Sequence, residues 1–444
     1  MIIISNDMKN IFLILTLFII SLSCSEKRES YKSQFNSVAE HYVKLVLALG
    51  KYDADYVDAY FGPEQLKREA EKWNLNINQI KQQTDSLIKV LREINITGLS
   101  KDEEQRISFL KRMIESVKSR AEILTGKKMS FDEESKALFD VVVDKISDDS
   151  KSEILTELNN LLPGKGSLNK RFIDYRKQFI IPQDKIDTVF KKSIEEGKNR
   201  TLAYLSFPKN EKFILEYVRN KSWGGYNWFK GTSTSLIQIN IDLPVYIDRA
   251  VGLACHEGYP GHHVYHSLIE EKFVKLNGWI EFTVYPLFSP LAVLSEGLAN
   301  YGIEVAFPDD QRIQFEKEVL FPLAGLSTEK ADEYYKILEL VGKLDYSSIN
   351  ISRDFLDAKI NRNEAIERTM KAKLRTKEHA ETNIKFFEQY RSYIVTYYSG
   401  EELCRNWVES KLKSSKNPEK DRWKYFQELI SKPYLPSDLS IIRR

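Results

Sequence analysis

The sequence predicts a mainly α-helical protein: a large multi-helix domain with a small β element beside a cleft. Three observations predict this fold class. From residue 31 onward, apolar side chains recur at helical spacings in one segment after another. A single stretch, 235–241, alternates along the chain and is rich in Ile, which is typical of a strand. The sequence shows no internal repeat and no low-complexity segment.

The N-terminal half reads as consecutive helices. The first is predicted from Tyr31 to Leu49, and Gly50 ends it. Phe61-Gly62-Pro63 forms a break before a helix that opens at Glu64. Further amphipathic helices are predicted near 76–95, 101–124, 131–147, 150–162 and 183–205.

The character of the sequence changes after residue 221. Residues 222–231 form a glycine- and aromatic-rich loop that precedes the predicted strand. Asp242 and Pro244 then predict the cap and first turn of a helix over 244–259. The remaining helices are predicted near 290–306, 311–346, 360–375, 377–397 and 419–431.

The first 24 residues predict an export signal. Lys9 precedes the apolar run 11–20, which is too short to span a membrane, and small residues follow it before Cys24. This order resembles a bacterial lipobox with Cys24 as the lipid-bearing first mature residue. We therefore predict a lipoprotein signal peptide over 1–24 and a single domain over 25–444. The protein would be an exported lipoprotein, held at a periplasm-facing or cell-surface membrane; a plain cleaved signal or a short anchor is the alternative.

The charge composition of the chain bears on which kinds of molecule it could bind. The chain has 66 Lys and Arg against 64 Asp and Glu, a net charge of +2, so we expect no basic footprint for nucleic acid. Most charges alternate in sign along helical stretches and predict solvated helix faces. Cys255 and Cys404 remain in the mature chain. Because Cys255 adjoins a candidate metal ligand, we predict a buried free thiol there in preference to a disulfide.

Four of the six histidines gather in one short segment, at 256, 262, 263 and 266, and Glu257 adjoins the first of them. Neutral imidazoles are zinc ligands, and a carboxylate beside the metal can take a proton from water. The segment therefore predicts a Zn²⁺ site in which His256 is a ligand and Glu257 is the general base. The alternative is an incidental buried pair in a core helix.

The spacing departs from the His-Glu-x-x-His zinc helix, because Pro260 stands at the fourth position. On a regular helix His262 would point about 120° away from His256, and His263 would lie about 10 Å further along the axis. Pro260 and Gly261 therefore predict a break that swings a histidine back. His262 is favoured because it needs the smaller excess loop; His263 is the alternative second imidazole.

Glu296 is the one charged residue within 290–303. An acid in so apolar a helix needs a partner or a metal. We therefore predict Glu296 as the third metal ligand, with Asn300 one turn later orienting another ligand. A buried salt bridge between Glu296 and Arg249 is the alternative.

The motif His-Glu-Gly-Tyr-Pro-Gly-His-His, followed by Ser-Glu-Gly-Leu-Ala-Asn-Tyr, resembles the bacterial domain-of-unknown-function 885 family. That family is similar in style to helical zinc carboxypeptidases of the gluzincin type. The likeness covers most of the mature chain and is most specific over 223–307. It implies a zinc-metallopeptidase-like helical fold in which His256 and the 262/263 pair belong to the metal motif, Glu257 is the base and Glu296 the third ligand.

The chain also departs from the family pattern. Leu298 stands where the family usually has Trp, and Ile303 where it often has an acid. Ser392-Tyr393 resembles a family Ser-Tyr-x-x-Gly element without its Gly. Tyr393 is a candidate catalytic residue that could donate to an oxyanion, with core packing as the competing interpretation.

These patterns predict a zinc-dependent hydrolase, a carboxypeptidase- or dipeptidase-like metallopeptidase acting on a peptide or small amide through zinc-activated water. Two alternatives remain open at this point. One is a metal-dependent hydrolase of a non-peptide amide or ester. The other is a non-catalytic metal-binding surface lipoprotein.

Overall fold

The structure is a computed structural model that describes residues 32–94, 96–145, 151–221, 223–242 and 244–440. The predicted signal peptide and Cys24 lie outside these residues. Within them, no helix is both long enough and apolar enough to cross a membrane. Cys255 and Cys404 are both buried free thiols, as predicted.

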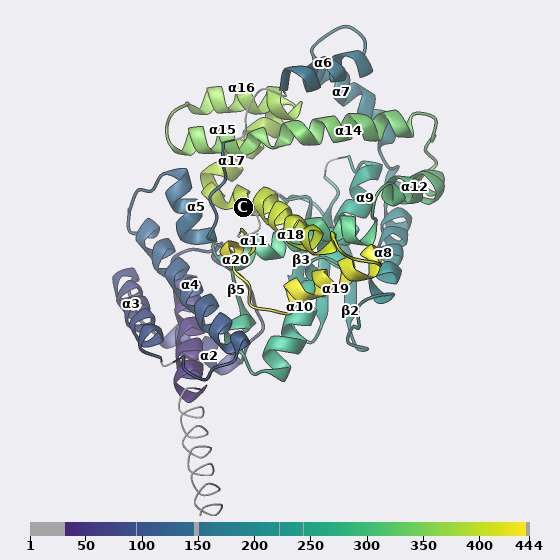
Figure 1. Ribbon diagram of the computed structural model, residues 1–444. Helices are drawn as coiled ribbons and strands as arrows, with labels where there is room; N and C mark the ends of the chain where they lie inside the picture. Colours follow the sequence, from purple (N-terminus) through teal and green to yellow (C-terminus); the bar gives the residue numbers. More distant parts are fainter. Residues whose placement is uncertain (1–31, 95, 146–150, 222, 243, 441–444) are drawn as a thin grey trace, which may run out of the picture.

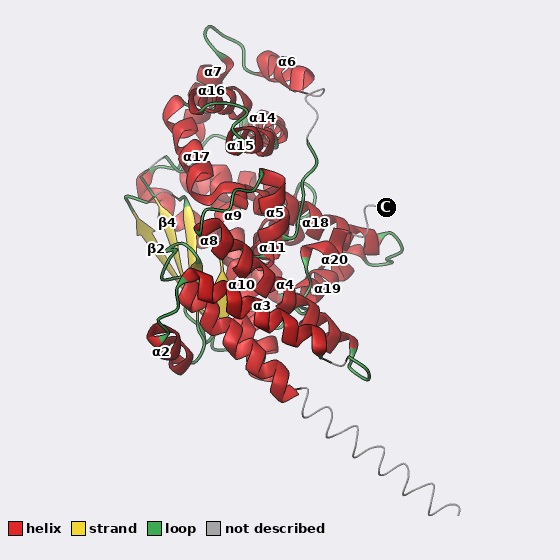
Figure 2. Ribbon diagram, turned by 90° about the vertical axis from the view of Figure 1, so that its left-hand side faces the viewer, coloured by secondary structure: helices red, strands yellow, loops and turns green. Residues whose placement is uncertain are grey.

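Helices dominate the structure and confirm the mainly α prediction (Figures 1 and 2). The N-terminal half contains a helix over 32–49, α2 (Glu64–Lys72), α3 (Ile77–Glu93), α4 (Lys101–Leu124), α5 (Phe131–Phe139), α6 (Lys151–Leu161), α7 (Leu168–Arg176) and α8 (Ile186–Leu202). The next part contains α9 (Ile247–Leu253), α10 (His262–Ile269), α11 (Pro290–Ala306), α12 (Gln311–Phe315), α13 (Phe321–Ala324) and α14 (Ala331–Asp345). The C-terminal part contains α15 (Ser347–Leu356), α16 (Arg362–Lys373), α17 (Lys377–Tyr390), α18 (Val395–Leu412), α19 (Pro418–Ile430) and α20 (Pro436–Ser440).

Several helix starts are set by local sequence. Asn76, Ser100 and Ser130 each form a capping box at the first turn of α3, α4 and α5, in which side chain and backbone satisfy each other's hydrogen bonds. Three expectations were wrong in extent. The helix expected near 131–147 ends at Phe139, and the one expected over 311–346 is interrupted by residues 325–330. The helix expected near 377–397 ends at Tyr390, and the separate helix α18, which begins at Val395, was not expected.

Helix α11 lies near the middle of the molecule, and α18 packs along it (Figure 1). Glycines allow the two backbones to touch: a Cβ at Gly297 would lie 2.3 Å from the carbonyl group of Gly400. Helices α6, α7, α14 and α16 lie at one end of the molecule, and α2 and α3 lie at the other (Figures 1 and 2). Glu296 is therefore carried by a central helix, most of whose residues are buried.

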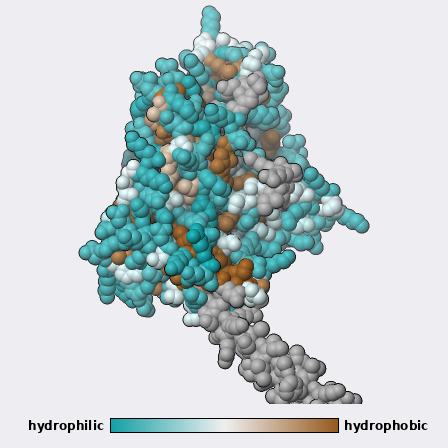
Figure 3. Space-filling model, turned by 60° about the vertical axis from the view of Figure 1, so that its left-hand side comes forward, coloured by the Kyte–Doolittle hydropathy of each residue, from teal (hydrophilic) through white to brown (hydrophobic). Residues whose placement is uncertain are grey.

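The main hydrophobic core draws on residues from Phe35 to Leu439. A smaller cluster joins α6, α7 and α14 around Leu158 and Ile337. The single domain over 25–444 stays a prediction. The face drawn in Figure 3 is mostly hydrophilic, with hydrophobic residues in small separate patches, as expected for helices with solvated charged faces.

Two small sheets complete the fold. Strand β1 (Val57–Tyr60) pairs with β5 (Val284–Pro286) in antiparallel orientation. The second sheet has the order β2-β4-β3, with β4 (Thr234–Asn240) parallel to β2 (Lys212–Val218) and antiparallel to β3 (Gly225–Phe229). The predicted strand is present as β4, whose side chains alternate between buried and half-buried. It is the central strand, however, and part of the predicted glycine- and aromatic-rich loop forms the edge strand β3.

Candidate metal centre

The helix that carries His256 and Glu257 ends in a wide turn. Helix α9 continues into a π-helical turn, η3 (Ala254–Gly258), whose last hydrogen bond runs from Tyr259 N–H to Ala254 C=O at 3.3 Å. Tyr259 then adopts extended dihedrals, and α10 begins at His262. The helix break expected at Tyr259-Pro260-Gly261 is thus present in the structure.

Gly261 makes this turn possible. Its N–H donates to the carbonyl of Cys255 at 2.9 Å. A Cβ at this position would lie only 1.9 Å from the carbonyl oxygen of His256 and 2.3 Å from that of Cys255. Because both neighbours are backbone atoms, no side chain fits here, and only glycine lets the chain fold back against η3.

The turn brings two imidazoles and a carboxylate together. Nε2 of His256 lies 3.4 Å from Oε2 of Glu296, and Nε2 of His262 lies 3.7 Å from Oε1 of the same carboxylate. The two imidazole rings are almost perpendicular, with centroids 4.7 Å apart. Ligand atoms of His256, Glu257 and His262 also lie within 4.8 Å of one another. Glu257 therefore lies as close to the two imidazoles as a further ligand would.

Each of the two imidazoles forms a hydrogen bond through its Nδ1 atom. Nδ1 of His256 lies 2.9 Å from Oδ1 of Asn300, which is an acceptor, so Nδ1–H donates there. Nδ1 of His262 forms a 3.2 Å hydrogen bond with the hydroxyl of Ser295. Both partners are on α11 beside Glu296. A neutral His256 would therefore carry its proton on Nδ1 and keep Nε2 free for a cation, whereas the hydroxyl of Ser295 can donate or accept and does not fix the tautomer of His262.

His263 lies outside this cluster. Its ring is fully buried, with Nδ1 2.8 Å from the hydroxyl of Ser235 and Nε2 3.0 Å from Oε2 of Glu211. Glu211 also accepts a hydrogen bond from Tyr259 at 2.7 Å. Both nitrogens of His263 are therefore engaged in holding α10 against the β2-β4-β3 sheet.

Burial and charge set the protonation of the cluster. Burial alone would lower the pKa of His256, but the contact with Glu296 and the charge of Glu257 raise it to about 9. Burial opposes ionisation of Glu296, yet its histidine neighbours hold its pKa below the usual value. Burial lowers the pKa of His262 to about 4 and raises the pKa of Glu257 to about 7. Near neutral pH, the His262 imidazole is therefore uncharged, and it lies opposite an ionised Glu296.

The donor set and its spacing fit a zinc ion. Ligand atoms at 2.0–2.1 Å from a tetrahedral zinc are about 3.4 Å apart, close to the 3.4 and 3.7 Å between Glu296 and the two Nε2 atoms. Oε2 of Glu296 is buried and has no hydrogen-bond partner within the described part of the chain. A buried carboxylate oxygen without a donor is costly, and a cation between it and the imidazoles would remove that cost.

Strand β3 runs beside Glu257. A Cβ at Gly225 would lie 3.2 Å from Oε1 of Glu257, so the carboxylate rests against the strand backbone. The side chain of Asn227 donates to the backbone carbonyl of Glu257 at 2.7 Å. The hydroxyl of Tyr226 donates to Asp58, whose pKa burial raises to about 6. The sequence indicates an aromatic loop here but carries no signal for Asp58 or Asn227.

The structure gives Tyr393 a specific partner. Its hydroxyl is buried and donates to Oε1 of Glu296 at 3.1 Å. Arg249, the alternative ion-pair partner considered for Glu296, has no hydrogen bond to it and no ion pair with it. Oxyanion stabilisation by Tyr393 stays a prediction, because the contact seen is with the carboxylate.

A cavity of about 1070 Å³ adjoins the cluster. Gly224, Leu253 and Asn300 line it, as do residues of α14. Asn300 contacts His256, and a Cβ at Gly225 would contact both Leu253 and Glu257, so the cavity provides space for a ligand next to the cluster.

Comparisons with known proteins agree with the fold. A protein from Colwellia psychrerythraea, described as a "putative lipoprotein", superposes with a TM-score of 0.53 at 14% identity, over 83% of this chain and 69% of that one. An M32 carboxypeptidase from Deinococcus radiodurans R1 gives a TM-score of 0.47 at 10% identity, over 92% of this chain and 94% of that one. At these identities the first likeness shows a shared fold, and the second carries no inference.

No family model matches the sequence, and no curated protein matches it. Membership of the domain-of-unknown-function 885 family therefore stays a prediction that rests on the two motifs.

Proposed function

We propose that the protein is a zinc-dependent metallopeptidase in which His256, His262 and Glu296 hold the metal and Glu257 is the general base. One observation carries the proposal: Nε2 of His256 lies 3.4 Å from Oε2 of the buried Glu296, Nε2 of His262 lies 3.7 Å from Oε1, and Oε2 makes no hydrogen bond within the described part of the chain. A carboxylate and two imidazoles with an open fourth position is the ligand set of catalytic zinc in several peptidases.

The two carboxylates differ in their contacts, and this difference supports their roles. Glu296 contacts both imidazoles and the Tyr393 hydroxyl, so it is fixed as a ligand would be. Within the described residues, the carboxylate of Glu257 has no hydrogen bond or ion pair to another side chain, and it rests on Gly225. It is therefore the group that is free to exchange a proton.

A bound Zn²⁺ would supply a Lewis acid that polarises the scissile carbonyl and acidifies a water molecule. Glu257 would take a proton from the attacking water and pass it to the leaving nitrogen. Burial holds the pKa of Glu257 near 7, which suits a group that both accepts and returns a proton near neutral pH. Asn300 and Ser295 would orient the imidazoles, and Tyr393 would position Glu296.

Strand β3 is the sheet edge that could receive a peptide. Strand 235–241 was expected to edge the cleft, but β4 is paired on both sides and cannot add another strand. Strand β3 is paired on one side and lies against Glu257. An extended peptide that added to β3 would run past the base.

The proposal is tested with a mixture of peptides and, in parallel, simple esters and non-peptide amides. Zinc-loaded protein should cleave peptides, and a chelator should abolish the cleavage until zinc is restored. Cleavage of esters or non-peptide amides alone would replace the peptidase by another hydrolase. Tightly bound zinc with no hydrolysis of any substrate would favour a non-catalytic metal protein.

Replacing His262 by Ala should remove most of the bound zinc, whereas replacing His263 by Gln should leave it. His262 faces Glu296, but both nitrogens of His263 are engaged elsewhere. The fall in zinc affinity for His262→Ala should exceed the loss of about tenfold to hundredfold that is typical when a hydrogen-bond partner of a metal ligand is removed. Zinc per folded chain, measured by elemental analysis, checks this; the opposite ranking of the two variants would move the metal to His263.

We also propose that the chain is anchored through a lipid on Cys24. Replacing Cys24 by Ser should release the mature protein from the membrane fraction or leave its precursor uncut, because acylation needs the thiol. Fractionation and the mass of the mature chain check this. Unchanged mass and membrane association would point to a different anchor.

A further inference from the structure

Asp58 is a carboxylate close to the metal centre that the proposed chemistry leaves unused. It lies in β1, which pairs with β5. The pairing shifts register between Val57 and Ala59, which pair with consecutive residues of β5, so Asp58 is an extra residue in the ladder. A bulge of this kind re-aims a side chain and is common next to active sites. The backbone of β1 therefore gives Asp58 a direction that a regular strand would not.

The side chain of Asp58 is directed towards the proposed base and the metal ligands. It accepts a hydrogen bond from the hydroxyl of Tyr226, on the strand that runs beside Glu257. Burial raises the pKa of Asp58 to about 6, and the charge of Glu296 adds to this shift. Burial likewise raises the pKa of Glu257 to about 7, and the charges of Glu296 and Asp58 contribute. The three carboxylates are therefore close enough to repel one another.

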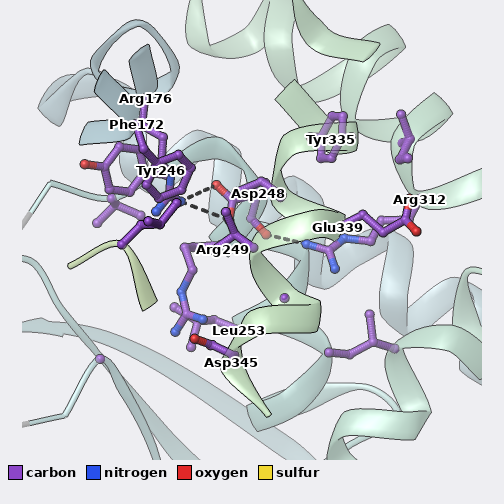
Figure 4. A pocket seen from close by; sticks show the side chains of 18 of the residues that line it. Phe172, Arg176, Tyr246, Asp248, Arg249, Leu253, Arg312, Tyr335, Glu339 and Asp345 are labelled. Atoms are coloured by element: carbon purple, nitrogen blue, oxygen red, sulfur yellow. Dashed lines mark hydrogen bonds and ion pairs between the residues drawn. The ribbon is translucent and has the colours of Figure 1, made fainter. Parts of the chain in front are cut away.

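Asp58 has no basic partner. Its side chain makes no ion pair with a Lys, Arg or His of the described chain, and the hydroxyl of Tyr226 is its hydrogen-bond partner. Arginines line the cavity that adjoins the metal centre, but Asp58 is not part of its wall; Figure 4 labels Arg176, Arg249 and Arg312 there. A zinc ion held by its own ligands would leave Asp58 without a cation in contact. A positively charged ligand would remove the cost of this partly buried charge.

Aromatic side chains surround Asp58. Burial raises the pKa of four tyrosines, and the charge of Asp58 adds to each shift, so all four lie near it: Tyr285, Tyr390, Tyr393 and Tyr397. Asp58 itself, Tyr226, Tyr390 and Tyr397 are half-buried, so this group is not sealed from solvent. Aromatic rings attract ammonium groups. The surroundings of Asp58 therefore favour an organic cation as its ligand.

We propose that Asp58 binds a primary ammonium group of the substrate, so that the enzyme selects peptides with a positive charge close to the bond that is cleaved. The proposal rests on the proposed metallopeptidase function. A carboxylate accepts charge-assisted hydrogen bonds from an ammonium, and the tyrosine rings add cation–π attraction. Two sources share this chemistry: a free α-amino group at the N-terminus of the substrate and a lysine side chain.

Matched peptides test the proposal and tell the two sources apart. One pair is tetra-alanine with a free and with an acetylated N-terminus. The other pairs are N-acetylated tetra-alanine with a single lysine at each position in turn, each compared with the same peptide carrying acetyl-lysine. Affinity is measured on the full mature chain carrying zinc and the Glu257→Gln change, so that binding does not depend on turnover. In at least one pair the ammonium form should bind about tenfold more tightly or better, as expected for a hydrogen-bonded charge; that pair identifies the source.

Replacing Asp58 by Asn should remove this preference. Asn keeps an oxygen that can accept the hydrogen bond of Tyr226 but loses the charge, so a purely structural role would survive the change and ammonium binding would not. In the enzyme with an intact Glu257, KM for the ammonium peptide should rise about tenfold or more. KM for its acetylated partner and the zinc content should stay the same.

Asp55→Asn is the matched control. Asp55 is exposed and accepts a hydrogen bond from Gln389 at 2.8 Å, so its replacement removes the same charge three residues from Asp58. This variant should keep the preference for the ammonium peptide. A preference lost equally in both variants would overturn the proposal, because long-range charge would then explain it.

Two further results would overturn the assignment of Asp58. The first is equal binding of every ammonium peptide and its acetylated partner, which needs no change at position 58 to be observed. The second is a preference that persists in Asp58→Asn.

Cleavage assays separate this proposal from the function on which it rests. If the protein hydrolyses peptides with and without an ammonium group equally well, the peptidase stands and the role of Asp58 fails. If it hydrolyses no peptide while the preference that depends on Asp58 persists in binding, the cation site stands and the peptidase function fails.

Discussion

Replacing Glu257 by Gln is expected to leave zinc bound while peptide hydrolysis falls by about a hundredfold or more, as removal of a general base does. Gln has nearly the same shape, so contacts with Gly225 and Asn227 should survive. The amide cannot accept a proton from water, and no other carboxylate of the cluster is free of the imidazoles. The measurement is kcat/KM on a peptide substrate, with zinc content determined on the same preparation.

The zinc content makes this result interpretable. Full zinc with strongly reduced activity supports Glu257 as the base. Loss of zinc together with activity would make Glu257 a ligand, which its position within 4.8 Å of both imidazoles would allow. A fully active Gln variant would mean that another group handles the proton.

Replacing Gly261 by Ala should destabilise the protein by about 3 kcal/mol or more, at the upper end of what overpacking costs, and should abolish zinc binding. The new Cβ would overlap the carbonyl oxygens of His256 and Cys255, which belong to the backbone and cannot rotate away. The turn would have to open, and His262 would move away from Glu296. Chemical denaturation gives the change in stability, and elemental analysis gives the zinc content.

Gly342→Ala is the control for a glycine substitution as such. Gly342 lies inside α14, and a Cβ there would meet no atom within 4 Å. This change should stabilise the protein by about 0.5–1 kcal/mol, the usual gain of Ala over Gly in a helix. If Gly261→Ala proved as harmless as Gly342→Ala, the turn would not depend on a missing side chain.

The helices were largely predictable because their signals are local. Helix α11 was expected over 290–306 and has those bounds, since Pro290 begins it and Phe307-Pro308 ends it. Strands β2 and β3 were missed. Residues 212–218 are rich in the strand-forming residues Phe, Ile, Tyr and Val, and this signal was overlooked. Residues 225–229 were expected as part of a loop, and they form a strand by pairing with β4.

The residues of the candidate site were also only partly predictable from the sequence. The pattern of His256, His262 and Glu296, with Pro260-Gly261 between the imidazoles, could be noticed in the sequence because it is short. The partners of the two imidazoles, Ser295 and Asn300, lie in the same motif as Glu296. Other contacts come from distant segments that carry no motif. Glu211 hydrogen-bonds His263 from 52 residues away, and only the folded chain shows why that histidine is engaged elsewhere.

A crystal structure of the zinc-loaded protein, with anomalous data collected at the zinc edge, tests the central claim most directly. We predict one strong anomalous peak bonded to Nε2 of His256, Nε2 of His262 and the carboxylate of Glu296, at about 2.0–2.2 Å from each. Glu257 should lie beside the fourth, open position. A peak between His263 and Glu211, a peak ligated by Glu257 in place of Glu296, or no peak after zinc loading would contradict it.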